Sequence, residues 1–315
     1  MQWFAQAPSN IALIKYMGKK STGKNLPINP SFSYTLNDLK SSVMLESLPG
    51  KKDFWEPLDA PGAHPFTLSN VGKERFLKHI MHIKSLYNYS GGFIVRSCNS
   101  FPSDCGLASS ASSFAALTIC ALTALSELTE TSMPSIEIQA NISRHGSGSS
   151  CRSFFSPWVL WQEDTIKTIE IPYQNLHHQV IVISSKHKKV SSSDAHLRVK
   201  SSLFYQSRAE RATENLKLLL NAFAVKDWSD AFQICWREFQ DLHQLFANCS
   251  LPFSYITPSC QSMLDTLQTL WEREGDGPLV TMDAGPNIHL LYRDDQQELA
   301  ERFKLDYLIG NYDIL

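Results

Sequence analysis

The spacing of apolar residues changes along the chain. Up to about Ser185, short β-rich runs alternate with helix-compatible segments, whereas from about Ser201 apolar residues recur with the period of a helix. Two further β-like runs near the C-terminal end flank the turn sequence DAGP. The β-rich runs lie at 93–98, 158–161 and 180–184, the helical segments at 204–223, 227–246 and 259–274, and the last pair of runs at 278–282 and 287–292. This pattern predicts an α+β fold.

The change in texture also predicts two domains. The chain has 315 residues, and a domain usually takes about 100–200. The segment SSKHKKVSSSD between the two textures is polar, as a domain boundary usually is. We therefore expect an N-terminal domain over residues 1–188 and a C-terminal domain over residues 189–315.

Composition excludes several classes of protein. Apolar residues make up 43% of the chain and charged residues 19%, which is ordinary for a globular protein and excludes disorder and fibres. Lys and Arg number 29 against 31 Asp and Glu, so the formal net charge is −2. No overall field draws such a chain to nucleic acid or to an anionic membrane, so any phosphate chemistry must come from a local site.

Cysteine usage and hydropathy indicate a soluble, cytoplasmic protein. The 7 cysteines are odd in number, widely spaced and without a C-x-x-C pair, which is typical of reduced thiols. The longest strongly apolar stretch, residues 114–125, is shorter than the roughly 20 residues of a membrane span. The N-terminus lacks the basic-then-apolar pattern of a signal peptide.

The segment NSFPSDCGLASSASSFAALTICAL, residues 99–122, is the most informative one. Small or turn-forming residues lead directly into an apolar-periodic helix that starts near Ser110. Backbone N–H groups at such a helix start point outward, where the helix dipole favours an anion, beside the Ser109 and Ser110 hydroxyls. The segment is a candidate phosphate cradle. The alternative is a serine N-cap before a close-packed helix.

A second run of small residues, RHGSGSSCRS from Arg144 to Ser153, places two glycines among hydroxyls and between two arginines. Such a loop lets the backbone approach an anion closely, and Arg152 offers a fork of donors to a carboxylate or phosphate. The alternative is a flexible surface loop. It is not the nucleophile elbow of a serine hydrolase, because a glycine stands where G-x-S-x-G needs serine.

Lysines gather in the N-terminal string APSNIALIKYMGKK. If the strand continued through it, Lys15 and Lys19 would lie on one face and Tyr16 on the other. The alternative is ordinary solvated surface. The overlapping GKKSTGKN comes within one residue of a P-loop, but Asn25 stands in place of Ser or Thr, and the following LPINP forbids the helix that a P-loop needs.

One acidic residue stands at the end of a predicted strand. Asp283 follows the run PLVTM and precedes Ala-Gly-Pro, which leaves a carboxylate at a strand end, although simple turn chemistry gives the same pattern. Histidines do not indicate a metal site, since His177 and His178 diverge on a strand and no His/Cys cluster has a recognised ligand spacing. His243, on an apolar helix face, is the histidine with the most unusual setting.

Taken in chain order, these four segments resemble the GHMP small-molecule kinase superfamily and, within it, the diphosphomevalonate decarboxylase family. PSDCGLASSA is similar to the phosphate-binding loop of the superfamily. The decarboxylase family is indicated by APSNIALIKYMGKK followed by NLPINPSFSYTL, by GSGSSCRS and by MDAGPN. The segments span residues 7 to about 290 in the family's order, so chance agreement of all four is remote.

The resemblance implies a two-domain GHMP kinase fold. Its N-terminal domain would be ribosomal protein S5 domain 2-like and bind ATP, and the active site would lie in the cleft between this domain and a GHMP C-terminal domain. The implied reaction converts ATP and mevalonate 5-diphosphate to isopentenyl diphosphate, carbon dioxide, ADP and phosphate, with magnesium as a cofactor. Phosphorylating the tertiary hydroxyl makes a leaving group whose departure creates an electron-poor carbon next to the carboxylate. A homodimer is implied, and neither nucleic acid nor membrane is expected as a partner.

The resemblance also implies residue roles. Asp283 would accept the proton of the tertiary hydroxyl, Lys15 would stabilise that carboxylate, and Arg152 would hold the substrate carboxylate. Further substrate contacts are implied for Asn10, Tyr16, Lys19, Ser147, Gly148, Ser149 and Ser192. ATP contacts are implied for Pro102, Gly106, Leu107, Ala108, Ser109, Ser110 and Ala111, with Ser109 or Ser110 near magnesium.

Several positions depart from the family pattern. Met17 replaces a common Trp, and Ser156-Pro157 replaces Gly-Gly. Ser193 stands where some bacterial members have a diphosphate-binding Arg, for which Lys73 or Arg75 is a candidate substitute. Three alternatives therefore stay open: a decarboxylase of the monophosphate, a kinase that stops at the 3-phosphorylated product, and, from a different class, a non-catalytic ATP-binding module.

Overall fold

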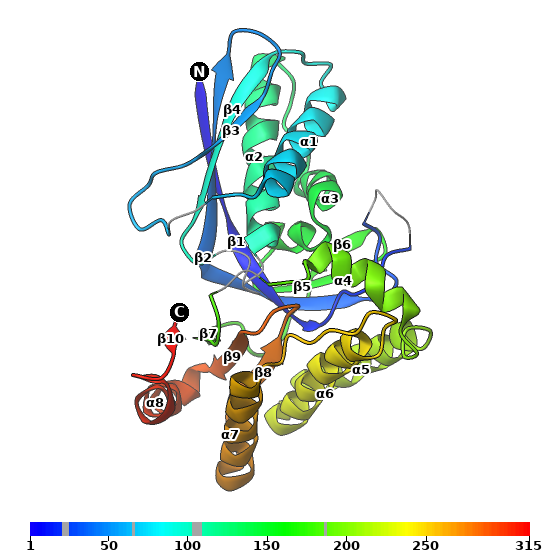
Figure 1. The fold of residues 1–315 in the computed structure, drawn as a ribbon, viewed down its shortest axis with the longest axis vertical. Coiled ribbons are helices and arrows are strands. Elements are labelled where there is room, and N and C mark those ends of the chain that lie inside the picture. Colours follow the sequence, from blue (N-terminus) through cyan, green and yellow to red (C-terminus); the bar gives the residue numbers. More distant parts are fainter. Residues whose placement is uncertain (21–24, 65–66, 103–108, 186–187) are drawn as a thin grey trace.

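The computed structural model describes residues 1–20, 25–64, 67–102, 109–185 and 188–315. Within these residues the chain forms two α+β halves, each with its own sheet and helices, and one half lies above the other in Figure 1. The predicted α+β fold is confirmed, and each of the β-like and helical runs predicted above coincides with a strand or helix of the structure.

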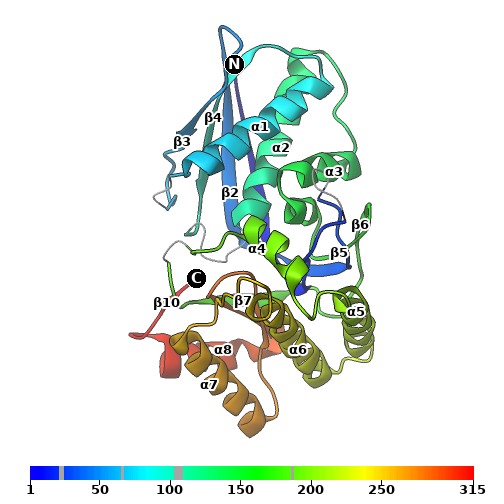
Figure 2. The same cartoon turned by 45° about the vertical axis from the view of Figure 1, so that its right-hand side comes forward.

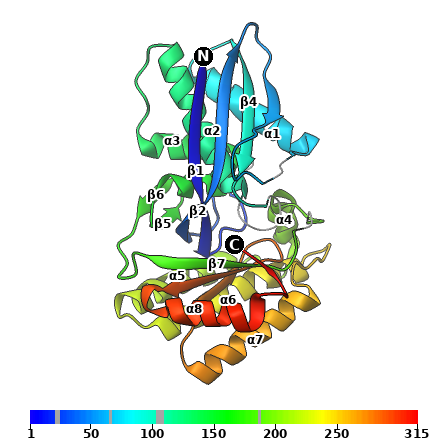
Figure 3. The same ribbon diagram turned by 90° about the vertical axis from the view of Figure 1, so that its left-hand side faces the viewer.

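The N-terminal half is built on a six-stranded sheet in the order β3-β4-β2-β5-β6, with β1 paired to β2. Helices α1, α2 and α3 lie on one face of this sheet, behind the strands in Figure 3. The strands are β1 (Gln2–Ile14), β2 (Ser31–Leu48), β3 (Phe54–Pro57), β4 (Gly92–Asn99), β5 (Trp158–Gln162) and β6 (Thr165–Thr168), and the helices are α1 (Asn70–Leu86), α2 (Ser109–Leu128), α3 (Ile136–Gly146) and the 3-10 helix η1 (Gly148–Phe154).

The C-terminal half contains a four-stranded antiparallel sheet in the order β10-β7-β9-β8. Its strands are β7 (Leu176–Val182), β8 (Leu279–Met282), β9 (Ile288–Arg293) and β10 (Asp313–Ile314). Its helices are α4 (Ser192–Arg198), α5 (Arg208–Ala224), α6 (Trp228–Ala247), α7 (Pro258–Glu274) and α8 (Gln297–Phe303), followed by a π-helical turn at Lys304–Leu308. Figure 2 shows α4 between the helices of the two halves.

Local sequence explains where the C-terminal helices begin and end. The side chain of Asp227 accepts a hydrogen bond from the backbone N–H of Asp230 and so caps α6, and Thr257 caps α7 in the same way. Helix α7 starts with Pro258, whose missing N–H costs nothing at a helix start, and it ends at Gly275, whose φ of 67° suits glycine. These caps fix the length of the helices that carry the core.

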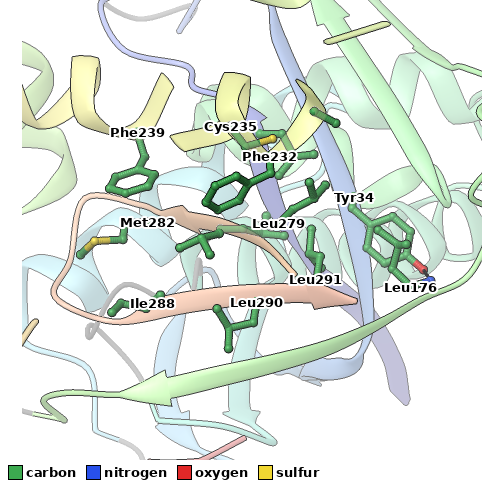
Figure 4. Packing of buried hydrophobic residues seen from close by; sticks show 14 of the residues in the cluster. Tyr34, Leu176, Phe232, Cys235, Phe239, Leu279, Met282, Ile288, Leu290 and Leu291 are labelled. Atoms are coloured by element: carbon green, nitrogen blue, oxygen red, sulfur yellow. Dashed lines mark hydrogen bonds between the residues drawn. The ribbon is translucent and has the colours of Figure 1, made fainter. Parts of the chain in front are cut away.

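One apolar core crosses from one half to the other. It includes Ile11, Leu13 and Ile14 of β1 together with residues of α5, α6, α7 and the second sheet. In Figure 4, Phe232, Cys235 and Phe239 of α6 lie over β8 and β9, with Tyr34 of β2 alongside. A separate core in the N-terminal half lies between its sheet and helices α1 and α2. The end of β1 is therefore held in the core of the C-terminal half.

The structure differs from the expected boundary at 188/189. Strand β7 pairs with β9 and so belongs to the second sheet, although it precedes the polar segment. By sheet membership the change falls between the end of β6 and the start of β7, at residues 169–175. The polar composition of residues 188–193 is explained by the cavity that they line, described below, and not by a domain boundary.

Helix α2 is the one helix among the described residues with the length and hydropathy of a membrane span. A buried core helix has the same properties, and 78% of its most apolar window is buried inside the protein. Its side chains Phe114, Leu117 and Leu122 belong to the N-terminal core. We therefore assign α2 to that core.

Candidate active site

A cavity of about 360 Å³ lies where the two halves meet. Its lining comes from both of them: the segment after β1, the start of α2, the segment 145–152, the polar segment at 188–193, and the turn after β8. Among the described residues, five of its lining side chains are Lys or Arg, and one is a carboxylate. They are Lys15, Lys19, Arg75, Arg152 and Lys188, with Asp283. A cavity with this charge balance is suited to a polyanionic ligand.

Asp283 and Lys15 form an ion pair in this cavity. The Lys15 Nζ donates to Asp283 Oδ1 at 2.9 Å, and their side chains are 2% and 25% exposed, respectively. Asp283 follows β8, whose residues Leu279–Met282 are buried, and the backbone N–H of Gly285 donates to Asp283 O at 2.8 Å across the predicted turn. The structure thus brings together two residues that the sequence singled out.

The surroundings of Asp283 keep its carboxyl ionised. Burial alone raises the pKa of this group, but the Lys15 ammonium, followed by His289, outweighs burial, and the pKa of Asp283 lies below its ordinary value. An ionised carboxylate accepts a proton, so Asp283 is in the state that a general base requires.

Strand β1 ends at Ile14, so the condition under which Lys15 and Lys19 would share one face of a strand is not met. Gly18 turns the chain at a φ of 97°, and a side chain there would collide with Ile28, whose Cδ1 lies 2.6 Å from the position of a Cβ. His196 accepts a hydrogen bond from the backbone N–H of Gly18 at 3.0 Å. After this turn, Lys19 lines the same cavity as Lys15.

Arg152 lies on η1 and is 3% exposed. Its Nε and Nη2 donate to Asn10 Oδ1 at 3.0 and 2.8 Å, and its Nη1 donates to Ser31 Oγ at 3.1 Å. In the described part of the chain it has no carboxylate partner within ion-pair distance. A buried guanidinium that lines a cavity without such a partner is a ready site for an anionic group.

Asn10 differs from its expected place in the site. Its side chain is fully buried and does not line the cavity. The amide oxygen accepts hydrogen bonds from Arg152, and the amide nitrogen donates to Ser153 Oγ at 2.8 Å. Asn10 therefore orients Arg152, and it acts on a ligand only through that residue. Sequence spacing could not show that the amide faces the guanidinium.

The glycine-serine segment adjoins the start of α2. Ser147 Oγ donates to Ser110 Oγ at 3.4 Å, and both serines line the cavity with Ser109 and Ser149. A side chain on Gly148 would collide with the Tyr16 ring, 2.7 Å from the position of a Cβ, so glycine is required for this close approach. Tyr16 and Gly148 also line the cavity. The two small-residue segments of the sequence therefore form one wall.

Some expected ATP contacts lie elsewhere. Gly106, Leu107 and Ala108 lie outside the described residues. Ala111 is fully buried, and neither it nor Pro102 lines the cavity. Ser109 and Ser110, the first residues of α2, are the members of this set that the cavity exposes.

The polar segment before α4 contributes residues that the sequence analysis largely missed. Lys188 Nζ donates to Ser192 Oγ and to Ala284 O, each at 2.9 Å, and so links this segment to the turn after Asp283. Ser191, Ser192 and Ser193 line the cavity beside it. Only Ser192 was expected there. The dense run of lysines and serines is the signal in the sequence, and the same composition is also typical of a domain boundary.

Of the two candidates for the missing diphosphate-binding arginine, the structure favours Arg75 over Lys73. Arg75 of α1 lines the cavity and donates to Gly146 O at 3.1 Å, whereas Lys73 lies over the Trp55 ring at 5.3 Å and does not line the cavity. Burial, followed by the charges of Arg75 and Lys200, lowers the pKa of Lys19. The cations near Lys19 thus repel one another in the free protein, and a bound polyanion relieves that repulsion.

Three histidines near the site differ in whether they line the cavity. His145 lines the cavity, as does His196, which lies against the Tyr16 ring at 4.5 Å between centroids. Burial lowers the pKa of His196 to about 3, so it is neutral and accepts the Gly18 hydrogen bond. His243 is buried on α6 beside Phe246 and does not line the cavity.

The donor set fits magnesium carried by a nucleotide. No group of three or more His, Cys, Asp or Glu in the described ranges is placed to hold a metal ion. The cavity offers serine hydroxyls and cations, and magnesium in phosphoryl-transfer sites is held largely by phosphate oxygens and water. Ser109 and Ser110 are the hydroxyls on the α2 side that could approach such an ion.

Comparison with solved structures defines the class of the fold. The chain matches a mevalonate diphosphate decarboxylase from Legionella pneumophila with a TM-score of 0.95, at 60% identity over 100% of both chains. It matches MDDEF in complex with MVAPP, AMPPCP and magnesium with a TM-score of 0.86, at 25% identity over 100% of this chain and 96% of that one. The protein thus has the two-domain GHMP kinase fold.

Sequence comparison gives the family. The model of the diphosphomevalonate decarboxylase-like N-terminal domain matches residues 7–169, and that of the mevalonate 5-diphosphate decarboxylase C-terminal domain matches residues 179–309. The diphosphomevalonate decarboxylase of Debaryomyces hansenii is 30% identical over 93% of this chain and 80% of its own length. The chain belongs to the diphosphomevalonate decarboxylase family, and the resemblance noted in the sequence is confirmed.

Proposed function

We propose that this protein is an ATP-dependent decarboxylase that converts mevalonate 5-diphosphate to isopentenyl diphosphate, with release of ADP, phosphate and carbon dioxide. The observation that carries the proposal is the meeting of the Lys15–Asp283 ion pair with Arg152 around one cavity, beside the serines at the start of α2. Each of these groups has a distinct task in such a reaction.

Asp283 acts as the general base in the first step. Its carboxylate takes the proton of the tertiary hydroxyl while that oxygen forms a bond to the γ-phosphorus of ATP and the bond from this phosphorus to ADP breaks. Lys15, 2.9 Å from Asp283, holds the carboxylate in place and keeps it ionised. The product of this step carries a phosphate leaving group on a tertiary carbon.

Arg152 holds the substrate carboxylate in the second step. When the new phosphate leaves, the carbon becomes electron-poor, and the bonding pair between the carboxylate carbon and its neighbour forms the double bond as carbon dioxide departs. The fork of Arg152, fixed by Asn10 and Ser31, keeps the carboxylate on the side where this pair can move.

Cations and hydroxyls of the cavity hold the phosphates. We assign the substrate diphosphate to Tyr16, Lys19, Ser147, Gly148, Ser149 and Ser192, and the ATP phosphates to the start of α2. Arg75 and Lys188 extend the positive surface next to these groups. Magnesium, when bound with ATP, neutralises charge on the β- and γ-phosphates.

The number of phosphates on the substrate separates this proposal from its nearest alternatives. With Lys15 paired to Asp283 and Arg152 assigned to the carboxylate, three further cations of the described residues line the cavity, and this number favours a diphosphate over a monophosphate. A kinase that stops at the 3-phosphorylated product would bind the same carboxylate, so release of carbon dioxide is what distinguishes it. A non-catalytic module needs no ionised carboxylate beside Lys15. The relative MDDEF, whose structure was solved in complex with MVAPP, supports a diphosphate as the substrate.

We also propose a cytoplasmic location and a homodimer. All six cysteines within the described residues are free thiols and buried, which supports a reducing compartment. The homodimer follows from the resemblance to the family, and light scattering on the purified protein tests it.

A coupled assay tests the proposed reaction. The protein is supplied with ATP, magnesium and either mevalonate 5-diphosphate or the 5-phosphate, and ADP and carbon dioxide are measured in parallel. We expect equal amounts of ADP and carbon dioxide with the diphosphate, and a much lower rate with the monophosphate. ADP without carbon dioxide would identify a kinase, and neither product would leave only the binding module.

A further inference from the structure

The peptide groups on both sides of the Lys15 Cα are held by an ion pair from the other half of the molecule. The backbone N–H of Lys15 donates to Glu238 Oε1 at 3.0 Å, and the Lys15 carbonyl accepts from Arg208 Nη2 at 2.9 Å. Asn29 adds a second hydrogen bond to the same carbonyl at 2.9 Å. Glu238 belongs to α6 and Arg208 to α5. These two helices lie side by side near the end of β1 (Figure 1).

Glu238 and Arg208 also bind each other. Arg208 donates to both oxygens of Glu238, and both side chains are fully buried. Asp241 accepts a further hydrogen bond from Arg208 at 2.6 Å and is in turn paired with Arg211 at 2.8 Å. Asn215 donates to Glu238 Oε2 at 2.7 Å. This set is rigid because every member is fixed by at least one other member.

A fully buried ion pair is a poor way to stabilise a fold. Removing two charges from water is so costly that apolar residues of similar volume often give equal or greater stability. The pair is better explained by the backbone that it fixes. It grips Lys15 at the residue where β1 ends and where the chain leaves the regular hydrogen bonding of the sheet.

The geometry connects this grip to the cavity. The Lys15 side chain reaches Asp283, which follows β8, and α6 packs against β8 in the shared core. Backbone and side chain of Lys15 are thus both held by the C-terminal half, although Lys15 itself belongs to the N-terminal half. A shift of α6 relative to β1 would move the Lys15 backbone and change the distance from Nζ to Asp283.

We propose that Glu238 and Arg208 are positioning residues that set the place of Lys15 against Asp283 by clamping its backbone. The inference rests on the proposed role of Lys15 in the reaction. Neither residue lines the cavity, so both act only through Lys15. Loss of the clamp should lower kcat while leaving the Michaelis constants for ATP and for the substrate nearly unchanged, because the phosphate-binding side chains keep their places.

The test removes both charges together, since removing Arg208 alone would leave Glu238 buried without its cation, and removing Glu238 alone would leave Arg208 with Asp241 as its one carboxylate partner among the described residues. In R208M/E238L the apolar side chains occupy similar volume and cannot bind the Lys15 backbone. We expect kcat to fall about 10- to 100-fold, the range for a reacting group displaced by roughly an ångström, with both Michaelis constants within threefold of wild type. Stopped assays of ADP and carbon dioxide give these constants.

Two further variants separate positioning from general damage. R208M/E238Q retains an oxygen acceptor for the Lys15 N–H, and we expect it to recover part of the lost kcat. K84M/D53L removes another buried ion pair, between Lys84 and Asp53 at 2.9 Å, neither of which lines the cavity. It should change thermal stability by a similar amount and leave kcat within twofold of wild type.

K15M completes the series and separates two failures. If K15M keeps wild-type kcat, Lys15 has no role in the reaction, and the proposed mechanism fails together with the clamp. If K15M is impaired but folded R208M/E238L keeps wild-type kcat, the clamp alone is overturned. Should R208M/E238L not fold, R208M/E238Q decides, because it removes the Arg208 bond to the Lys15 carbonyl: a several-fold loss of kcat supports the clamp, and wild-type kcat refutes it.

Discussion

Lys15 and Asp283 lie 268 positions apart in the chain, yet the Lys15 Nζ and the Asp283 Oδ1 are 2.9 Å from each other. The pair joins the end of the first strand to the turn after β8, and it spans the line along which the two halves meet. Because each partner comes from a different half, the pair exists only when both halves are folded and docked. This is why the chemistry that we propose depends on the shared core around β1.

The first prediction concerns the pH dependence of activity. In the wild type the pKa of Asp283 lies below the ordinary pKa of an aspartate, so the carboxylate stays ionised as the pH falls from neutral into the acid range. Protonation of Asp283 should therefore not limit the rate above about pH 5. In K15M the cation is gone, burial then raises the pKa of Asp283, and the acid limb of kcat/KM should move to higher pH. Rates measured from about pH 3.5 to 9, within the range where the protein stays folded, show this shift.

The matched control for this profile is K19M, which removes a cavity cation that has no hydrogen bond to Asp283. Its acid limb should stay where the wild type has it, while its KM for substrate rises. An identical limb in K15M and wild type would show that Lys15 does not govern the ionisation of Asp283.

The second prediction concerns Arg152. Lysine keeps the charge but loses the planar fork, and a single ammonium cannot bind Asn10 and Ser31 as the guanidinium does while also holding a carboxylate. We expect R152K to lower kcat/KM by about 100-fold, since truncating or altering a buried hydrogen-bonded charge costs about 2–5 kcal/mol. Steady-state rates with mevalonate 5-diphosphate measure the loss. Near-normal activity would remove Arg152 from the carboxylate role.

The third prediction concerns the phosphates. Arg75 lines the cavity beside Gly146, and Lys73, two positions earlier on the same helix, does not. R75A should raise the KM for mevalonate 5-diphosphate about tenfold, as expected for one lost charge-assisted contact, and change kcat little. K73A is the matched control and should behave as wild type. Equal behaviour of the two variants would show that Arg75 does not contact the substrate.

The fold could be predicted because its signals are local. The helical periodicity of α5, α6 and α7 and the paired runs of β8 and β9 lie within single segments of sequence, and the structure confirms each. The domain boundary could not be predicted in the same way. Strand β7 belongs to the second sheet because it pairs with β9 more than 100 positions later, and no local composition records that pairing.

The parts of the site that could be predicted are those where the residue type itself indicates the chemistry, such as a carboxylate or a glycine-serine loop. Asp283 at a strand end and the glycine-serine segment both line the cavity, as the resemblance implied. Asn10 and Glu238 show the limit of such reasoning. Both are buried and act through Arg152 or Lys15, and contacts of this kind arise only when segments 142 and 223 positions apart meet in the folded chain.

The most direct test of the account is the variant D283N. Asparagine has the same shape as aspartate but accepts no proton, so kcat should fall by about 100- to 10,000-fold, the usual contribution of a general base. ATP and mevalonate 5-diphosphate should bind within threefold of wild type by calorimetry, because the phosphate-binding residues are intact. Loss of binding together with turnover would show that Asp283 holds the fold of the cavity and is not the base, and would contradict the account.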